Sequence, residues 1–170
     1  QFDLFQQWIK ALSGHNAFQG KHASVGERSM LGVFQRVLTT RKHAAGAEMF
    51  KQLVRFDQLF DGLRGSMRTE VQNSIILADR QLSDYPLALK ALKALFMVKY
   101  FDNFKANLRN VSVLLLDHLD TNPAAHEEEV EQALNLLEQQ TYIQRKGELY
   151  EFLTSEEKDI EKEIKQMPVE

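Results

Sequence analysis

Residues 111–154 constrain the fold of this chain more than any other stretch, because two helical patterns are followed there by a hairpin pattern. The segments VSVLLLDHLD and HEEEVEQALNLLEQQ each carry an apolar stripe at helical spacing. In the segment TYIQRKGELYEFLT, bulky strand-favouring residues flank Arg145-Lys146-Gly147-Glu148, a turn in which glycine supplies the positive φ. A helix, a turn, a second helix and a two-stranded wing form the order of a winged-helix module.

The charge of the second helix argues against the nucleic-acid binding that winged helices often perform. Five glutamates, among them Glu127, Glu128 and Glu131, stand between His126 and Gln140 without a single Lys or Arg. A helix that reads the major groove needs hydrogen-bond donors for guanine and cations that displace phosphate counterions. We therefore expect these glutamates to face a protein partner.

The rival interpretation is a winged-helix DNA-binding module. In that case Arg145 and Lys146 at the tip of the wing contact the DNA backbone. Two cations at a hairpin turn also serve simple solvation, so the sequence leaves both explanations open.

The composition sets broad limits on the protein. Its 170 residues are 44% hydrophobic, which is enough for a packed core. Residues 86–170 hold 10 Lys and Arg against 16 Asp and Glu, so this half repels phosphate at long range. Cysteine is absent, which excludes disulfides and thiolate chemistry, and we expect a cytoplasmic protein. No apolar run approaches the length of a membrane span, so we expect no membrane contact.

Residues that end and begin helices predict two subdomains, residues 1–83 and residues 84–170. Tyr85-Pro86 ends a long amphipathic helix and begins another, because the residue before proline is pushed out of the helical region. Thr154-Ser-Glu-Glu157 is a capping box that opens a last helix. The apolar stripe of the long helix consists of Met67, Val71, Ile75, Ala78 and Leu82. The core side of the helix after Pro86 consists of Leu89, Leu92, Leu95 and Phe96. The apolar face of the last helix consists of Ile160, Ile164 and Met167.

No catalytic motif is present in this chain. It contains no GxxxxGK[ST] phosphate loop, no GxSxG and no HExxH, so we predict that this segment is not itself an enzyme. His126 followed by glutamates invites a metal site, but the residue four positions on is Val130. Acidic residues in the first turn also complement the helix dipole, and we predict no metal.

Arg28 is the candidate contact to a nucleotide. Ser24-Val-Gly-Glu27 forms a capping box, so Arg28 lies in the opening turn of the helix that follows. A cation there opposes the dipole unless an anion compensates it, and free N–H groups beside a guanidinium would suit a phosphate. The alternative is that Arg28 pairs with Glu27 or another carboxylate in solvent.

Three stretches carry a resemblance to a known family. The runs LFQQWIKALSGHNAFQGKHASVGERSMLGVFQRVL, VRFDQLFDGL and YIQRKGELYEFLTSEEKDIEKEIK together resemble the P-loop ATPases of bacteriophage-exclusion (BREX) defence systems, the BrxC/PglY family. The resemblance implies that this chain, which begins without Met, is a piece of a longer ATPase whose nucleotide-binding core precedes it. ATP and Mg²⁺ would belong to the full-length protein, and the segment itself would hold no cofactor.

The resemblance also implies a fold and a role. It implies a mainly α chain, with a helical AAA+ lid-like bundle over residues 1–83 and a winged-helix module with one β-hairpin over residues 84–170. Arg28 matches the position of the "sensor 2" arginine that AAA+ lids often carry. The implied role is regulation and protein interaction in phage defence, and the implied partners are other BREX proteins or further subunits of the same ATPase.

Overall fold

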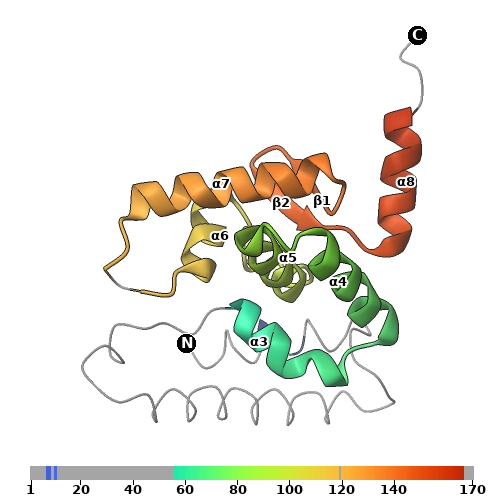
Figure 1. The fold of residues 1–170 in the computed structure, drawn as a ribbon, viewed down its shortest axis with the longest axis horizontal. Coiled ribbons are helices and arrows are strands. Elements are labelled where there is room, and N and C mark those ends of the chain that lie inside the picture. The colour runs from blue at the N-terminus through green and yellow to red at the C-terminus, as the bar shows by residue number, and fades with distance from the viewer. Residues whose placement is uncertain (1–6, 9, 11–55, 119, 167–170) are drawn as a thin grey trace.

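The computed structural model describes residues 7, 8, 10, 56–118 and 120–166 (Figure 1). This part of the chain is mainly helical, ends in one hairpin and a last helix, and so confirms the general fold class expected from the sequence. The elements in order are α3 (Phe56–Leu63), the 3-10 turn η2 (Arg64–Ser66), α4 (Thr69–Gln81), α5 (Pro86–Val98), α6 (Leu108–Leu115), α7 (Pro123–Gln139), β1 (Ile143–Lys146), β2 (Leu149–Phe152) and α8 (Ser155–Gln166). The capping box at Ser24 and the helix predicted to contain Arg28 lie outside the described residues.

Helix α5 forms the centre of the structure, with α3, α6, α7 and β2 packed around it (Figure 1). Pro86 occupies the first turn, as the sequence predicts. Small and large apolar residues alternate along PLALKALKALFMV, so α5 is buried on most sides rather than along one stripe. Leu92, Leu95 and Phe96 are buried as predicted, whereas Leu89 is only half-buried.

Helix α4 carries the central part of the predicted apolar stripe. Ile75 and Ala78 are buried on it, and Val71 packs partly buried against the same core. Met67 and Leu82 are buried too, but they flank the helix, which is shorter at both ends than predicted. The predicted subdomain boundary falls on the turn between α4 and α5. The buried residues on both sides of that turn belong to one hydrophobic cluster.

The hairpin forms where it is predicted, but its turn lies one residue later. Lys146 pairs with Leu149, so the two loop residues are Gly147 and Glu148. The predicted turn, Arg145–Glu148, would have placed Lys146 and Gly147 in the loop. Arg145 belongs to the strand because it pairs with Tyr150, and its guanidinium lies 5.3 Å from the centroid of that ring. Gly147 has a φ of 63°, which is the left-handed conformation expected for it.

Helix α6 is shorter than the sequence suggests. The apolar pattern predicts a helix from about Asn110 almost to Asn122, but α6 spans Leu108–Leu115. The Asn107 side chain caps its start by accepting a hydrogen bond from the Asn110 N–H at 2.9 Å. The helix ends because Leu116 adopts an extended backbone, with a ψ of 123°. This end could not be predicted, because neither glycine nor proline stands there.

Two well-formed termini fix the ends of α7 and α8. At the end of α7, the Tyr142 N–H donates to the Leu137 carbonyl and the Thr141 N–H donates to the Glu138 carbonyl, which is a Schellman motif. Its left-handed position is occupied by Thr141, with a φ of 62°, instead of the usual glycine. At the start of α8, the Thr154 N–H donates to the Glu157 carboxylate at 2.7 Å and the Glu157 N–H donates to the Thr154 hydroxyl at 3.3 Å, so the predicted capping box is confirmed.

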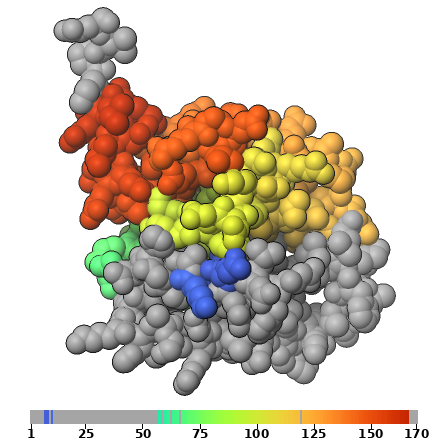
Figure 2. Space-filling model, turned by 180° about the vertical axis from the view of Figure 1, so that it is seen from behind, coloured from blue at the N-terminus to red at the C-terminus, as the bar shows by residue number. Residues whose placement is uncertain are grey.

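Helix α8 extends from one edge of the body (Figures 1 and 2). None of its residues is buried, and the predicted apolar positions Ile160 and Ile164 are exposed. Seen from behind, the hairpin lies beside the loop that follows α5 (Figure 2). Within the described residues, no helix combines the length and apolar character that crossing a membrane requires.

We predict that Gly147→Ala destabilises the chain by about 1 kcal/mol, since an L-residue at positive φ is strained. A Cβ at this position would meet no atom within 4 Å, so the change isolates the backbone effect. Gly65 provides the matched control, because its Cβ position is equally open and its φ is not in the left-handed range. Urea unfolding should show Gly65→Ala to be neutral or stabilising. Equal effects of the two substitutions would contradict this explanation of the turn.

Candidate functional site on the helix-helix-hairpin unit

The predicted functional residues of the C-terminal half lie on α7 and β1. Together with α6 and β2, these elements form what we call the helix-helix-hairpin unit. Helix α7 packs against α5 and α6 through its apolar side, formed by Val130, Ala133, Leu134 and Leu137. Its opposite side is fully polar. The exposed stripe along it consists of Glu128, Glu131, Gln132, Asn135 and Gln139, and we call it the α7 stripe.

The α7 stripe is acidic at its N-terminal end and neutral at its C-terminal end. Glu128 and Glu131 are exposed as predicted, whereas Glu127 is half-buried at the margin. Because α7 contains neither Lys nor Arg, the stripe offers carboxylate acceptors and amides but no cation. Such a surface repels nucleic-acid phosphates and attracts a basic protein surface.

His126 has a structural contact rather than a metal environment. Its Nε2 lies 2.9 Å from the carbonyl oxygen of Ser112, which links the start of α7 to α6. Within the part of the chain that the structure describes, no three side chains of metal-binding type converge. The histidine therefore helps to hold the two helices together.

The two cations of the hairpin interact with their own hairpin. The Arg145 Nε donates to the Gly147 carbonyl at 3.0 Å, and the guanidinium covers the Tyr150 ring. The Lys146 Nζ lies 2.8 Å from a carboxylate oxygen of Glu151. Both side chains are exposed, but Lys146 would have to share or leave Glu151 in order to contact a phosphate.

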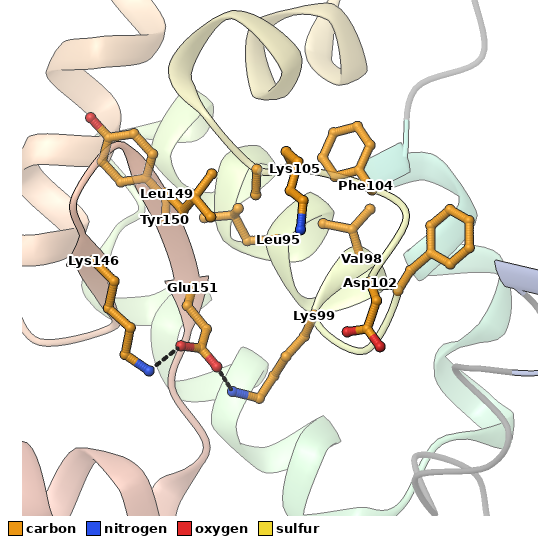
Figure 3. Close-up of a pocket in the computed structure, with 12 residues that line it drawn as sticks. Leu95, Val98, Lys99, Asp102, Phe104, Lys105, Lys146, Leu149, Tyr150 and Glu151 are labelled. Atoms are coloured by element: carbon orange, nitrogen blue, oxygen red, sulfur yellow. Dashed lines mark hydrogen bonds and ion pairs between the residues drawn. The ribbon is translucent and has the colours of Figure 1, made fainter.

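A buried lysine anchors the hairpin to the helices (Figure 3). The side chain of Lys99 is only 3% exposed, and its Nζ lies 3.2 Å from the Glu151 carboxylate and 2.9 Å from the Glu157 carboxylate. The same Nζ donates to the Phe152 carbonyl at 2.6 Å. One ammonium group therefore joins the end of α5, strand β2 and the start of α8.

Both carboxylates that contact Lys99 are held in the ionised form. Burial alone would raise the pKa of Glu151, but hydrogen bonds from Lys146 and Lys99 outweigh it and lower the pKa to about 2. Burial likewise opposes ionisation of Glu157, but the Thr154 N–H and Lys99 lower its pKa overall. Both glutamates are therefore ionised at neutral pH.

A pocket of about 200 Å³ lies beside this network (Figure 3). Its walls are largely apolar and come from α5, the loop after α5 and the hairpin, with Val98, Phe104 and Leu149 among them. Two of its three lysines, Lys99 and Lys146, are already paired with Glu151. The pocket suits one apolar side chain of a partner better than an anion.

Sequence reasoning did not find Lys99. Its partners are 52 to 58 residues away in the sequence, so no local spacing could predict that Lys99 contacts Glu151, Phe152 and Glu157. Arg28 lies outside the residues that the structure describes.

Comparison with known proteins adds no family: no family model matches the chain, and no solved structure matches it.

We predict that Lys99→Met destabilises the chain by about 2 kcal/mol, because it leaves two carboxylates and a carbonyl without their common donor. The loss falls below that of a fully buried pair because Glu151 and Glu157 are 34% and 41% exposed. Urea unfolding measures it, with Lys90→Met on the same helix as the control. Equal, small effects of both substitutions would contradict the anchoring role of Lys99.

Proposed function

We propose that this chain is the lid and winged-helix portion of a BREX-type phage-defence ATPase. In this proposal α6 and α7 are the helix-turn-helix of the winged helix, and β1 and β2 are its wing. The observation that carries the proposal is the α7 stripe, because the helix in the position of a recognition helix is exposed, acidic and free of cations. The unit then contacts a protein rather than a nucleic acid.

The charge pattern indicates the kind of protein that fits. Glu128 and Glu131 would pair with Lys or Arg on the partner, and the amides of Gln132 and Asn135 would hydrogen-bond beside them. Exposed charges of this kind chiefly set the rate of association and its salt dependence. Another protein of the BREX system or a neighbouring subunit of the same ATPase would supply the basic surface.

The lid would act by closing on nucleotide bound to the preceding core, and Arg28 would contact the terminal phosphate. Contacts that lead from Trp8 through the end of α5 to the wing support this coupling. The Trp8 indole N–H donates to the Met97 carbonyl at 2.8 Å, and Lys99, two residues further on, holds β2. A displacement at Trp8 therefore reaches the hairpin through the end of α5.

DNA binding is the second candidate, and one observation favours it. Gln132, Asn135 and Gln139 are exposed on the α7 stripe, and amide side chains can pair with adenine in the major groove. Glu128 and Glu131 on the same stripe oppose that approach, and Lys146 is engaged with Glu151. The protein-contact proposal accounts for all of these charges.

For the contact surface, we predict that Glu128→Lys combined with Glu131→Lys in the full-length protein abolishes protection against phage while ATP turnover is retained. The matched control is Glu156→Lys combined with Glu163→Lys, which makes the same charge change at exposed positions of α8. Phage plating and ATP turnover are the two measurements. Protection that survives the α7 substitutions, or is lost equally in the control, would exclude the α7 stripe as the contact surface.

For the lid, we predict that Arg28→Ala in the full-length protein lowers ATP turnover, since a positive charge that stabilises the transferred phosphate is lost. Arg28→Lys should recover part of the turnover. If Arg28→Ala left both turnover and nucleotide affinity unchanged, the sensor assignment would be wrong.

A further inference from the structure

A second cleft, of about 480 Å³, opens between α4, the junction of α7 and β1, and α8. It is separate from the pocket of Figure 3, which lies between α5 and the hairpin. Most of the residues that line it are of polar type. The lining residues that bear on its chemistry are Ser74, Thr141, Tyr142, Ser155, Lys158 and Lys162, with Glu70 and Asp159 also among the residues that line it.

Lys158 is the unusual residue of this cleft. It is half-buried, and its Nζ lies 4.5 Å from the centroid of the Tyr142 ring and 3.5 Å from the Ser74 hydroxyl. Among the residues that the structure describes, no carboxylate lies within ion-pair distance of this ammonium. Lys93, Lys99 and Lys146 each have a carboxylate oxygen at 2.7 to 2.9 Å.

Among the described residues, no ion pair compensates the charge of Lys158. Burial lowers its pKa, and the neighbouring Lys162 lowers it further, whereas Asp159 opposes them. Holding a desolvated cation without a counter-ion costs free energy, which an anion in the cleft would recover. The contacts with the Tyr142 ring and the Ser74 hydroxyl are weak substitutes for an ion pair.

Other groups in the cleft add donors for an anion. Lys162 lies one turn after Lys158 on α8 and lines the same cleft. The Thr141 hydroxyl accepts a hydrogen bond from Lys165 at 3.3 Å, so its own proton remains free to donate. The Ser74 hydroxyl likewise accepts from Lys158 and keeps its proton. Two cations and two hydroxyl donors match an anion with three or more acceptor oxygens better than a carboxylate.

We propose that this cleft binds the phosphate group of a small phosphate monoester, with Lys158 and Lys162 as its cationic contacts. The cleft is larger than a phosphate ion needs, so it has room for the organic part of the ester. Glu70 and Asp159 would accept hydrogen bonds from hydroxyl groups of that part, which suits a sugar-like body. This site is independent of the proposed contact surface on α7.

Calorimetric titration of the chain with ribose 5-phosphate and with inorganic phosphate tests the proposal. We expect saturable binding of both probes, with ribose 5-phosphate bound more tightly. Lys158→Gln should weaken binding of ribose 5-phosphate by about tenfold or more, which corresponds to losing one charge-assisted hydrogen bond. The matched control is Lys90→Gln, which removes the same charge at a residue of α5 that does not line the cleft, and it should bind like the unmodified chain.

The outcomes separate the parts of the proposal. Absence of saturable binding by either probe would overturn the site, and so would equal weakening by Lys158→Gln and Lys90→Gln, because binding would then follow net charge alone. Equal affinity for both probes would overturn the monoester and leave a free-phosphate site. Thermal unfolding without ligand checks the fold of the Lys158→Gln variant. Its melting temperature should match or exceed that of the unmodified chain, since the substitution removes an uncompensated cation.

Discussion

The arrangement of the C-terminal half depends on the ammonium group of Lys99. A two-stranded hairpin is marginal on its own in water, so β1 and β2 need to be held against the helices. Lys99 does this through the Phe152 carbonyl and two carboxylates, while the Phe152 ring packs edge-on against Phe96 with a centroid distance of 5.2 Å. The Tyr150 N–H adds a hydrogen bond to the Ala106 carbonyl at 2.9 Å. Together these contacts fix the hairpin and the start of α8 relative to α5.

Two lysines of this chain illustrate how environment decides the use of one residue type. Lys99 is more deeply buried than Lys158, yet its charge is neutralised by Glu151 and Glu157 and serves the fold. Lys158 lies over an aromatic ring without a carboxylate and retains a charge for a ligand. A buried charge that is paired therefore indicates structure, and a half-buried charge left uncompensated beside a cleft indicates binding.

Features that depend on neighbours within about four residues could be predicted from the sequence. The Thr154 to Glu157 capping box, the positive φ of Gly147 and the apolar stripe of α4 are of this kind. The Lys99 network could not be predicted, because it joins residues more than fifty positions apart. The left-handed backbone of Thr141 could not be predicted for a different reason. A β-branched residue is disfavoured at positive φ, and tertiary packing overrides that preference here.

The candidate surface was predicted in its charge but not in its detail. The composition of α7 alone shows that it is acidic, and the structure adds that Glu128 and Glu131 face outward while Glu127 is half-buried. The pairing of Lys146 with Glu151 was not visible either, although it bears on how the wing can contact a phosphate backbone. Side-chain partners across a hairpin depend on register, and the turn lies one residue away from its predicted position.

The most direct test of the central claim, that the helix-helix-hairpin unit faces protein and not nucleic acid, is the fluorescence anisotropy of labelled duplex DNA titrated with this chain at low salt. Low salt favours any contact between cations and phosphates, so it gives DNA binding its best opportunity. Our account predicts no saturable rise in anisotropy. A saturable rise that weakens steeply with added salt and disappears when Arg145 and Lys146 are both replaced by alanine would contradict it.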